Sequence, residues 1–205
     1  MNDEEFCFIY VTDILPPYTY SRLVEWLQTQ EYKSGKCISG KVIPRLQNWY
    51  QMDKKYFCEA WKYRYDRWKS EEYDDFLVVL QNFISAKTSE VLQKPITFNS
   101  CLVNKYRDGS DAIKPHRDCI ESFGEYPVIA GISIGETRTF RVNKIVYNTD
   151  NTRSLKTDTV YQDITLEDNS MLIMAGASQK YFTHEIIKDT TLKPRYSLTF
   201  RDFIN

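Results

Sequence analysis

The hydrophobic pattern divides the chain into a helical first half and a strand-rich second half. Residues 6–11 form a short apolar run that predicts a strand. Apolar residues recur at helical spacing over residues 18–29 and again over residues 73–93, where a Lys-Pro pair predicts the end of the second helix. Residues 33–48 are polar and contain Gly and Pro, so short strands joined by turns are expected there.

Beyond residue 95 the apolar positions follow the pattern of β-strands. Turn signals such as Asp108-Gly109 separate six candidate strands, which cover residues 96–103, 128–134, 137–142, 158–164, 170–175 and 196–203. Successive antiparallel strands in this number are typical of a jelly roll. The sequence therefore predicts an α+β fold with N-terminal helices and a C-terminal jelly-roll core.

Composition narrows the class of protein. The 205 residues suit one domain with a sizeable core. No apolar run approaches the roughly 20 residues that a membrane helix needs, and the N-terminus is too acidic for a signal peptide. The five cysteines are odd in number and form no CxxC pair, which indicates free thiols in a reducing compartment. We therefore expect an intracellular protein, of the nucleus or the cytoplasm, with no membrane partner.

Charge is distributed unevenly along the chain. The net charge is −1, whereas a dedicated nucleic-acid binder is often strongly basic. Residues 41–69, however, hold eight basic residues against three acidic ones, interleaved with Trp and Tyr. Cations for a phosphate backbone and rings for base stacking are what single-stranded nucleic acid requires. The alternative is that about half of these aromatics, including Trp61, Tyr65 and Trp68, form the core of the segment itself.

The chain contains only two histidines, His116 and His184. His116 and Asp118 are two residues apart, so on a strand both side chains would project from one face. Two imidazoles and one carboxylate form the facial triad of non-haem Fe(II) oxygenases. That triad leaves three coordination positions open, two for a chelating 2-oxo acid and one for O2. An HxD pattern alone is common, and it could equally be a hydrogen bond within a loop.

The C-terminal strand carries a second candidate constellation. Residues 195–201 alternate, which places Arg195, Ser197, Thr199 and Arg201 on one face. Arginines that face inward need anions, and a guanidinium binds a carboxylate bidentately. Since 2-oxoglutarate has two carboxylates and the arginines are roughly 20 Å apart, we expect them to bind different ends of it. The alternative is an edge strand with both arginines in solvent. Asn104 and Tyr106 also share a strand face and could hydrogen-bond the same molecule.

Taken in order, these motifs resemble the AlkB family of Fe(II)/2-oxoglutarate dioxygenases. The resemblance rests on residues 104–109 (NKYRDG), 116–118 (HRD), 129–141 (IAGISIGETRTFR), 172–184 (LIMAGASQKYFTH) and 195–201 (RYSLTFR), while residues 44–50 (PRLQNWY) resemble the family's nucleotide-recognition lid. It implies a single dioxygenase domain over residues 1–205. In that domain, residues 1–95 would form N-terminal helices and the substrate lid, and residues 96–205 a double-stranded β-helix (jelly-roll) core.

The resemblance also implies a function and a set of site residues. The activity would be oxidative demethylation of N-alkylated nucleobases (1-methyladenine, 3-methylcytosine) with release of formaldehyde, using Fe(II), 2-oxoglutarate and O2. The substrate would be a flipped or single-stranded base, in DNA rather than RNA, and the enzyme a monomer. Carried over by position, the metal ligands would be His116, Asp118 and His184, and the 2-oxoglutarate residues Asn104, Tyr106, Arg195 and Arg201. The substrate residues would be Tyr50, Trp49, Arg45, Glu121 and Arg138.

Some positions depart from the family pattern and leave other functions open. Several family members carry acidic residues soon after the HxD, whereas here only Glu121 supplies one. Ser197 stands where Asn is common in the family, and Phe182 stands where Trp is frequent. These departures leave the preferred base undecided. The alternatives are an RNA demethylase of the same family, an oxygenase of the same fold acting on protein or a small molecule, and a nucleic-acid binder without catalysis.

Overall fold

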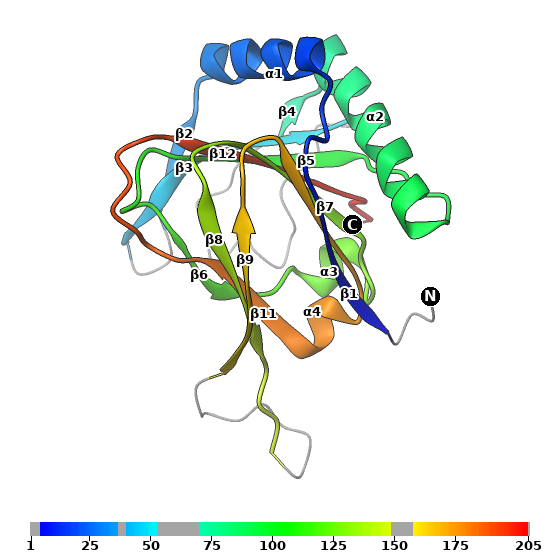
Figure 1. Ribbon diagram of the computed structural model, residues 1–205, viewed down its shortest axis with the longest axis vertical. Coiled ribbons are helices and arrows are strands. Elements are labelled where there is room, and N and C mark those ends of the chain that lie inside the picture. Colours follow the sequence, from blue (N-terminus) through cyan, green and yellow to red (C-terminus); the bar gives the residue numbers. More distant parts are fainter. Residues whose placement is uncertain (1–4, 37–39, 53–69, 149–157, 205) are drawn as a thin grey trace.

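The computed structural model describes residues 5–36, 40–52, 70–148 and 158–204, which form two long helices and two β-sheets, antiparallel except for one short parallel pair. The larger sheet has the strand order β1-β10-β7-β12-β5-β3-β2, with the short β4 pairing β3, and the smaller sheet has the order β6-β11-β8-β9 (Figure 1). The strands of the larger sheet are β1 (Phe6–Val11), β2 (Lys33–Lys36), β3 (Val42–Gln51), β4 (Glu71–Glu72), β5 (Ser100–Tyr106), β7 (Ile129–Gly135), β10 (Ser170–Gly176) and β12 (Arg195–Arg201). Those of the smaller sheet are β6 (Ile113–His116), β8 (Arg138–Lys144), β9 (Thr159–Leu166) and β11 (Phe182–Ile186).

Both long helices cover the face of the larger sheet that points away from the smaller sheet (Figure 1). Helix α1 (Pro17–Thr29) has a proline in its first turn, where the missing N–H costs nothing. Helix α2 (Asp75–Leu92) is capped by Asp74, whose carboxylate accepts a hydrogen bond from the N–H of Leu77. The buried residues of these helices (Leu23, Trp26, Leu27, Leu77, Leu80 and Ile84) share one core with Val103, Ile132, Ile173 and Leu198 of the sheet.

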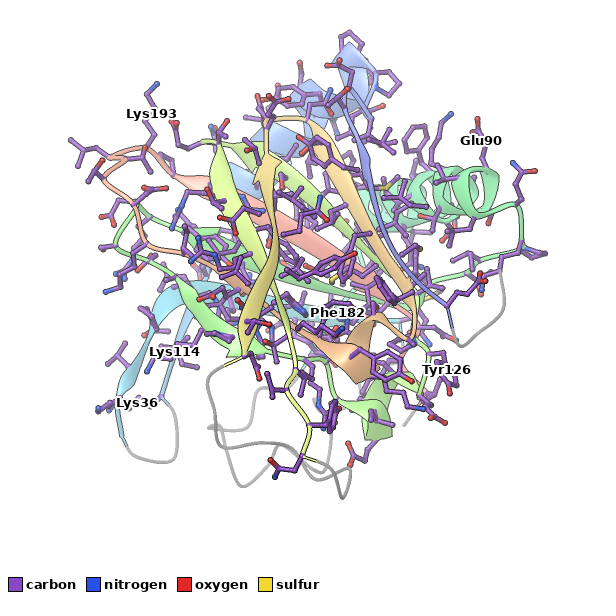
Figure 2. All side chains as sticks on the ribbon, turned by 60° about the horizontal axis from the view of Figure 1, so that its bottom comes forward. Lys36, Glu90, Lys114, Tyr126, Phe182 and Lys193 are labelled. Carbon is purple, nitrogen blue, oxygen red and sulfur yellow. The ribbon has the colours of Figure 1, made fainter. Side chains whose placement is uncertain are left out.

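A second core fills the space between the two sheets. It combines residues of the larger sheet with residues of the smaller one: Tyr106, Ile129, Leu172, Met174, Phe140, Val142, Ile164, Leu166, Phe182 and Ile186. Phe182, on β11, lies in the middle of the molecule in Figure 2. Two facing antiparallel sheets around such a core confirm the predicted α+β double-stranded β-helix.

The polar stretch at residues 33–48 differs from its prediction. The four-residue β2 agrees with the expected short strands, whereas β3 runs for ten residues and pairs with β5 on one side and β2 on the other. Polar residues such as Gln47 and Gln51 are therefore buried inside a sheet. A long strand with buried polar residues shows no apolar alternation, so the pattern did not predict it. Strands β1 and β3 precede residue 95 but belong to the larger sheet. The larger sheet therefore contains residues from both sides of the predicted boundary between lid and core, and that division stays a prediction.

Two short strands, β6 and β11, were not predicted although they carry both histidines. Their apolar runs are too brief to show a period. The predicted strands at residues 6–11 and in the C-terminal half are confirmed, within a few residues at their ends. Trp61, Tyr65, Trp68 and most of the basic cluster lie outside the described residues.

Two further features of the described residues concern membrane helices and cysteines. No helix within it is long and apolar enough to cross a membrane. The cysteines found there, Cys7, Cys101 and Cys119, are thiols and not disulfides.

Candidate metal centre

The two histidines face each other across neighbouring strands of the smaller sheet. His184 of β11 is directly opposite His116 of β6, and their ring centroids are 4.3 Å apart. One ligand atom each from His116, Asp118 and His184 lie within 4.8 Å of one another. Among the described residues this is the one cluster of such ligands, so the structure brings together the three residues that the sequence selected.

Asp118 reaches the cluster by a different route from the one predicted. Strand β6 ends at His116, so the i, i+2 alternation of a strand does not place Asp118. Instead, Asp118 lies in the turn before the short helix α3 (Ile120–Phe123). Its backbone N–H donates to Oε1 of Gln179 (2.9 Å), and its carboxylate accepts from Nε of Arg201 (2.5 Å). The predicted geometry is therefore corrected, while the residue remains part of the cluster.

Hydrogen bonding orients the His116 ring. Its Nδ1 lies 2.9 Å from the carbonyl oxygen of Lys114. Since a carbonyl only accepts, Nδ1 carries the hydrogen and Nε2 keeps the lone pair that a metal ion requires. The ring of His184 stacks on Phe140 at 5.3 Å with an interplanar angle of 15°. Both imidazoles are thus held in defined orientations by residues of the protein.

Burial and charge put each candidate ligand in its metal-binding form. Burial, with His116 nearby, lowers the pKa of His184 to about 3, and burial also lowers the pKa of His116. Burial would raise the pKa of Asp118, but Arg201 and His184 outweigh it, so this pKa lies below its usual range. At neutral pH the site therefore offers two neutral imidazoles and one carboxylate, the forms that coordinate metals.

Arg195 occupies the other end of β12 and is buried, with 2% of its surface exposed. Its Nη2 donates to Oγ of Ser133 (2.8 Å), and the guanidinium lies 5.2 Å from the centre of the Tyr106 ring. In the described chain its Nε and Nη1 have no hydrogen-bond partner and no carboxylate pairs with it. Burial lowers its pKa to about 10, so it stays charged at neutral pH.

An uncompensated cation of this kind is costly, and a bound carboxylate would satisfy it. The residues around it supply further polar groups. Ser197 of β12 lies between Asn104 of β5 and Ser133 of β7 in the sheet register, so all three share the inner face. Oδ1 of Asn104 already accepts from Nε of Arg45 and from Nε2 of Gln47, each at 2.8 Å. Its amide N–H groups are consequently the ones left to donate to a ligand. The chain therefore fits 2-oxoglutarate, which Arg195, Tyr106 and Asn104 would hold at one end and Arg201 would approach at the other.

Arg138 has a different task from the predicted substrate contact. Its side chain is 1% exposed and donates to the carbonyl oxygens of Asp108, Asp111 and Ile187. It also forms an ion pair with Asp189 at 2.6 Å. These contacts tie together the loops that follow β5 and β11, so the structure gives Arg138 a role in joining these loops, and its contact with a substrate stays a prediction.

The adjacent aromatic residues Trp49 and Tyr50 point to opposite faces of the larger sheet. Tyr50 lies on the helix side, where it packs against Trp26 and its hydroxyl donates to Oε1 of Gln30 (2.9 Å). The prediction that Tyr50 faces the substrate is therefore corrected. Trp49 lies on the inner face and packs against Phe123 and Phe203, with 6.3 Å between ring centroids in each pair.

The other substrate candidates, Arg45 and Glu121, lie on β3 and α3. Arg45 points along the inner face of β3 toward Asn104. Glu121 is exposed on α3, close in sequence to Asp118, and its carboxylate accepts from the thiol of Cys119 (2.9 Å). Their contacts with a base stay predictions.

Sequence reasoning missed three residues that support the site: Gln47, Ser133 and Gln179. Each is a polar residue that the structure buries, with 6%, 2% and 1% of its surface exposed. An uncharged polar residue inside an otherwise apolar run was the signal available for Ser133 (ISIG), whereas Gln179 stands between Ser178 and Lys180 and carries no such signal.

Comparisons with known proteins agree with this geometry. The sequence profile of the 2OG-Fe(II) oxygenase superfamily matches residues 8–201. The mouse (Mus musculus) "Alpha-ketoglutarate-dependent dioxygenase alkB homolog 3" is 36% identical over 162 residues, which cover 77% of this chain and 51% of that protein. The mouse "DNA oxidative demethylase ALKBH2" is 31% identical over 111 residues, or 53% of this chain and 44% of that protein.

The chain thus spans about half the length of these curated relatives. Among solved structures, that of OsALKBH1 superposes with a TM-score of 0.60 at 18% identity, covering 95% of this chain and 97% of the other. This likeness supports the fold. The curated relatives, which are named as AlkB homologues, agree with the AlkB resemblance that the motifs indicated.

Proposed function

This chain belongs to the 2OG-Fe(II) oxygenase superfamily, and on that basis we propose that it removes methyl groups oxidatively from nucleobases in DNA. Its cofactor is Fe(II), and its cosubstrates are 2-oxoglutarate and O2. The observation that carries the proposal is the cluster of the half-buried His116 with Asp118 and His184, together with the buried Arg195, whose Nε and Nη1 have no hydrogen-bond partner among the described residues. The proposed substrates are 1-methyladenine and 3-methylcytosine, in keeping with a relative named DNA oxidative demethylase.

Each residue of the site has a defined part in this reaction. With Fe(II) and 2-oxoglutarate bound, O2 would supply one oxygen atom to hydroxylate the methyl carbon and the other to oxidise 2-oxoglutarate to succinate and CO2, and the hydroxymethyl group would then leave as formaldehyde. His116, Asp118 and His184 would hold the metal ion on one side and leave the other side open. Arg195 would bind a carboxylate of 2-oxoglutarate, since its buried charge has no other counterion in the described chain. Arg201 keeps Asp118 ionised and oriented.

The nucleic acid would bind over the open side of the site with its damaged base extruded or single-stranded, because a base inside a duplex cannot reach the metal. Arg45, Trp49 and Glu121 remain the candidates for contacting it. Lys36 and Lys114 point outward at the edge formed by β2 and β6 (Figure 2), where they could meet phosphates. An intracellular setting and a monomeric enzyme belong to the same proposal.

The decisive experiment offers the protein a panel of methylated oligonucleotides. Single- and double-stranded DNA and RNA carrying 1-methyladenine, 3-methylcytosine or N6-methyladenine would be incubated with Fe(II), 2-oxoglutarate and O2. We expect formaldehyde and repaired base in equal amounts, most rapidly from DNA, and none from the His116→Ala variant. Repair of RNA alone would make the protein an RNA demethylase. Succinate without formaldehyde or repaired base would instead favour an oxygenase that acts on protein or a small molecule.

A further inference from the structure

The carboxylate ligand of the candidate metal centre is held by a residue distant in sequence. Because β6 stops at His116, its ladder hydrogen bonds do not extend to Asp118. The N–H of Asp118 instead donates to Oε1 of Gln179, 61 residues later, at 2.9 Å. The side chain of Gln179 is 1% exposed, so water does not compete for this bond.

The amide of Gln179 is itself fixed at its other end. Its Nε2 lies 3.3 Å from Oγ of Ser178 and 3.8 Å from Sδ of Met174, both of which can accept a hydrogen bond. This assigns the NH2 group to those partners and leaves the carbonyl oxygen for Asp118. The orientation of the amide is therefore determined by its surroundings.

The backbone that carries Gln179 is anchored as well. Gln179 lies on the short helix α4 (Ser178–Tyr181), which leads directly into β11 and His184. Before the helix, Gly176 adopts a positive φ of 59°, and a Cβ there would lie 1.8 Å from the carbonyl oxygen of Glu5. The N–H of Ala177 donates to the same oxygen at 3.0 Å. The chain near Gln179 is thus locked to β1, so Gln179 gives Asp118 a fixed point of attachment.

These contacts hold Asp118 at two ends, its backbone by Gln179 and its carboxylate by Arg201. Through α4 the same glutamine also connects Asp118 to the strand of His184. We propose that Gln179 is a positioning residue that sets the distance between the Asp118 carboxylate and the two imidazoles, and so sets the affinity for the metal ion. This inference rests on the proposed function, since it requires that the three residues bind a metal.

The test replaces Gln179 by Met, which keeps the length of the side chain and loses the hydrogen-bond acceptor. Metal-free protein would be titrated with Mn(II) by calorimetry under anaerobic conditions, without substrate or turnover. We expect the dissociation constant to rise roughly tenfold or more, since loss of a partner that orients a metal ligand typically costs 10- to 100-fold in affinity. Hydrogen exchange at the Asp118 amide is expected to accelerate in the same variant.

A matched control is available on the opposite side of the larger sheet. Gln81 of α2 is 3% exposed and accepts a hydrogen bond from the hydroxyl of Tyr73. Gln81→Met removes an equally buried amide and should leave Mn(II) affinity unchanged. If Gln179→Met does not fold, Gln179→Asn takes its place. The Asn side chain is shorter by one methylene group, so its carbonyl oxygen cannot reach the N–H of Asp118.

The outcomes separate the two claims. A wild-type protein that does not bind Mn(II) would overturn the proposed function and this inference with it. A wild-type protein that binds, with a Gln179 variant of equal affinity, would overturn the inference alone. Equal weakening by Gln81→Met would likewise overturn it, because the effect would then be general destabilisation.

Discussion

At the scale of single residues, the site is defined by charges whose partners are missing or unusual. Arg201 finds its counterion in Asp118, and Arg138 finds one in Asp189. Arg195 has none among the described residues and keeps two open donors. A protein tolerates such a buried cation when a ligand supplies the anion. The partners of the three arginines therefore distinguish their roles: Arg138 and Arg201 pair with carboxylates of the protein, and Arg195 is the one left for a ligand.

The first prediction concerns Arg195. Changing it to Met should weaken binding of 2-oxoglutarate to the Mn(II)-loaded protein roughly 100-fold, because a charged hydrogen-bond pair contributes about 1.5–3 kcal/mol per bond. Lys should recover part of this affinity, since it keeps the charge and loses the bidentate geometry. Binding would be followed by calorimetry without O2. Arg141→Met, at the exposed pair with Asp163, is the control and should change little. Unaltered affinity in Arg195→Met would remove Arg195 from the cosubstrate site.

The second prediction follows from the lowered pKa of His184. In the folded, metal-free protein this pKa is about 3, whereas an unfolded histidine has a pKa of about 6.5. Between these values the unfolded state binds a proton that the folded state does not, so stability rises with pH and falls as pH drops below 6.5. The expected slope is about 1.4 kcal/mol per pH unit for each such histidine.

Urea unfolding of the metal-free protein between pH 7.5 and 5 would measure this slope. His116, whose pKa is also lowered, adds to it in the same direction. His184→Gln should reduce the slope by the contribution of one histidine. A stability that does not change over this pH interval would show that the imidazoles are protonated without cost, and the account of their burial would then be wrong.

At the scale of elements, the helices are joined to each other as well as to the sheet. The carboxylate of Asp74 caps α2 by accepting from the N–H of Leu77, and it also accepts from Nε1 of Trp26 on α1 at 2.5 Å. One side chain therefore fixes the start of α2 and its position against α1. Neither helix contributes a residue to the metal centre.

The third prediction is that Asp74→Ala destabilises the protein by about 1–2 kcal/mol, from the lost cap and the unpaired indole N–H. Asn caps a helix about as well as Asp, so Asp74→Asn should cost less than half as much. Denaturant unfolding would give both values. Mn(II) affinity should be unchanged in both variants, because the helices lie on the far face of the sheet; a parallel loss of affinity would mean that this face and the metal centre are coupled.

The same scale shows what the sequence could and could not predict. Long elements with a clear period, such as α2 and β12, were found because apolar spacing repeats over several turns or pairs. The short β6 and β11 were not found because their apolar runs are too brief to show a period. The strand geometry expected for Asp118 was wrong because Asp118 is held by Gln179, 61 residues later. Tyr50 was misplaced because adjacent strand residues face opposite ways, and nothing in β3 alone shows which face points to the helices.

At the scale of the whole molecule, the candidate metal ligands and the cosubstrate residues belong to different sheets. His116 and His184 lie on the smaller sheet, whereas Asn104, Tyr106 and Arg195 lie on the larger one. The pair of Asp118 and Arg201 connects the two sets. A metal ion held by the first set and 2-oxoglutarate held by the second would therefore depend on both layers of the fold.

The fourth prediction is that metal and 2-oxoglutarate stabilise the molecule cooperatively. Mn(II) at about 100 times its dissociation constant should stabilise the fold by roughly 2.7 kcal/mol, a shift of about 5–10 °C in melting temperature for a chain of this size. 2-Oxoglutarate should add a further shift when Mn(II) is present and little without it, because its chelating atoms need the metal. By linkage, 2-oxoglutarate must then tighten Mn(II) binding by the same factor as Mn(II) tightens 2-oxoglutarate binding. Thermal scans with each ligand alone and with both, without O2, would measure the effect. In Arg195→Met the shift in melting temperature from Mn(II) alone should persist, while the additional shift from 2-oxoglutarate should disappear. Equal, additive shifts in the wild-type protein and in Arg195→Met would show that the two sheets bind their ligands independently.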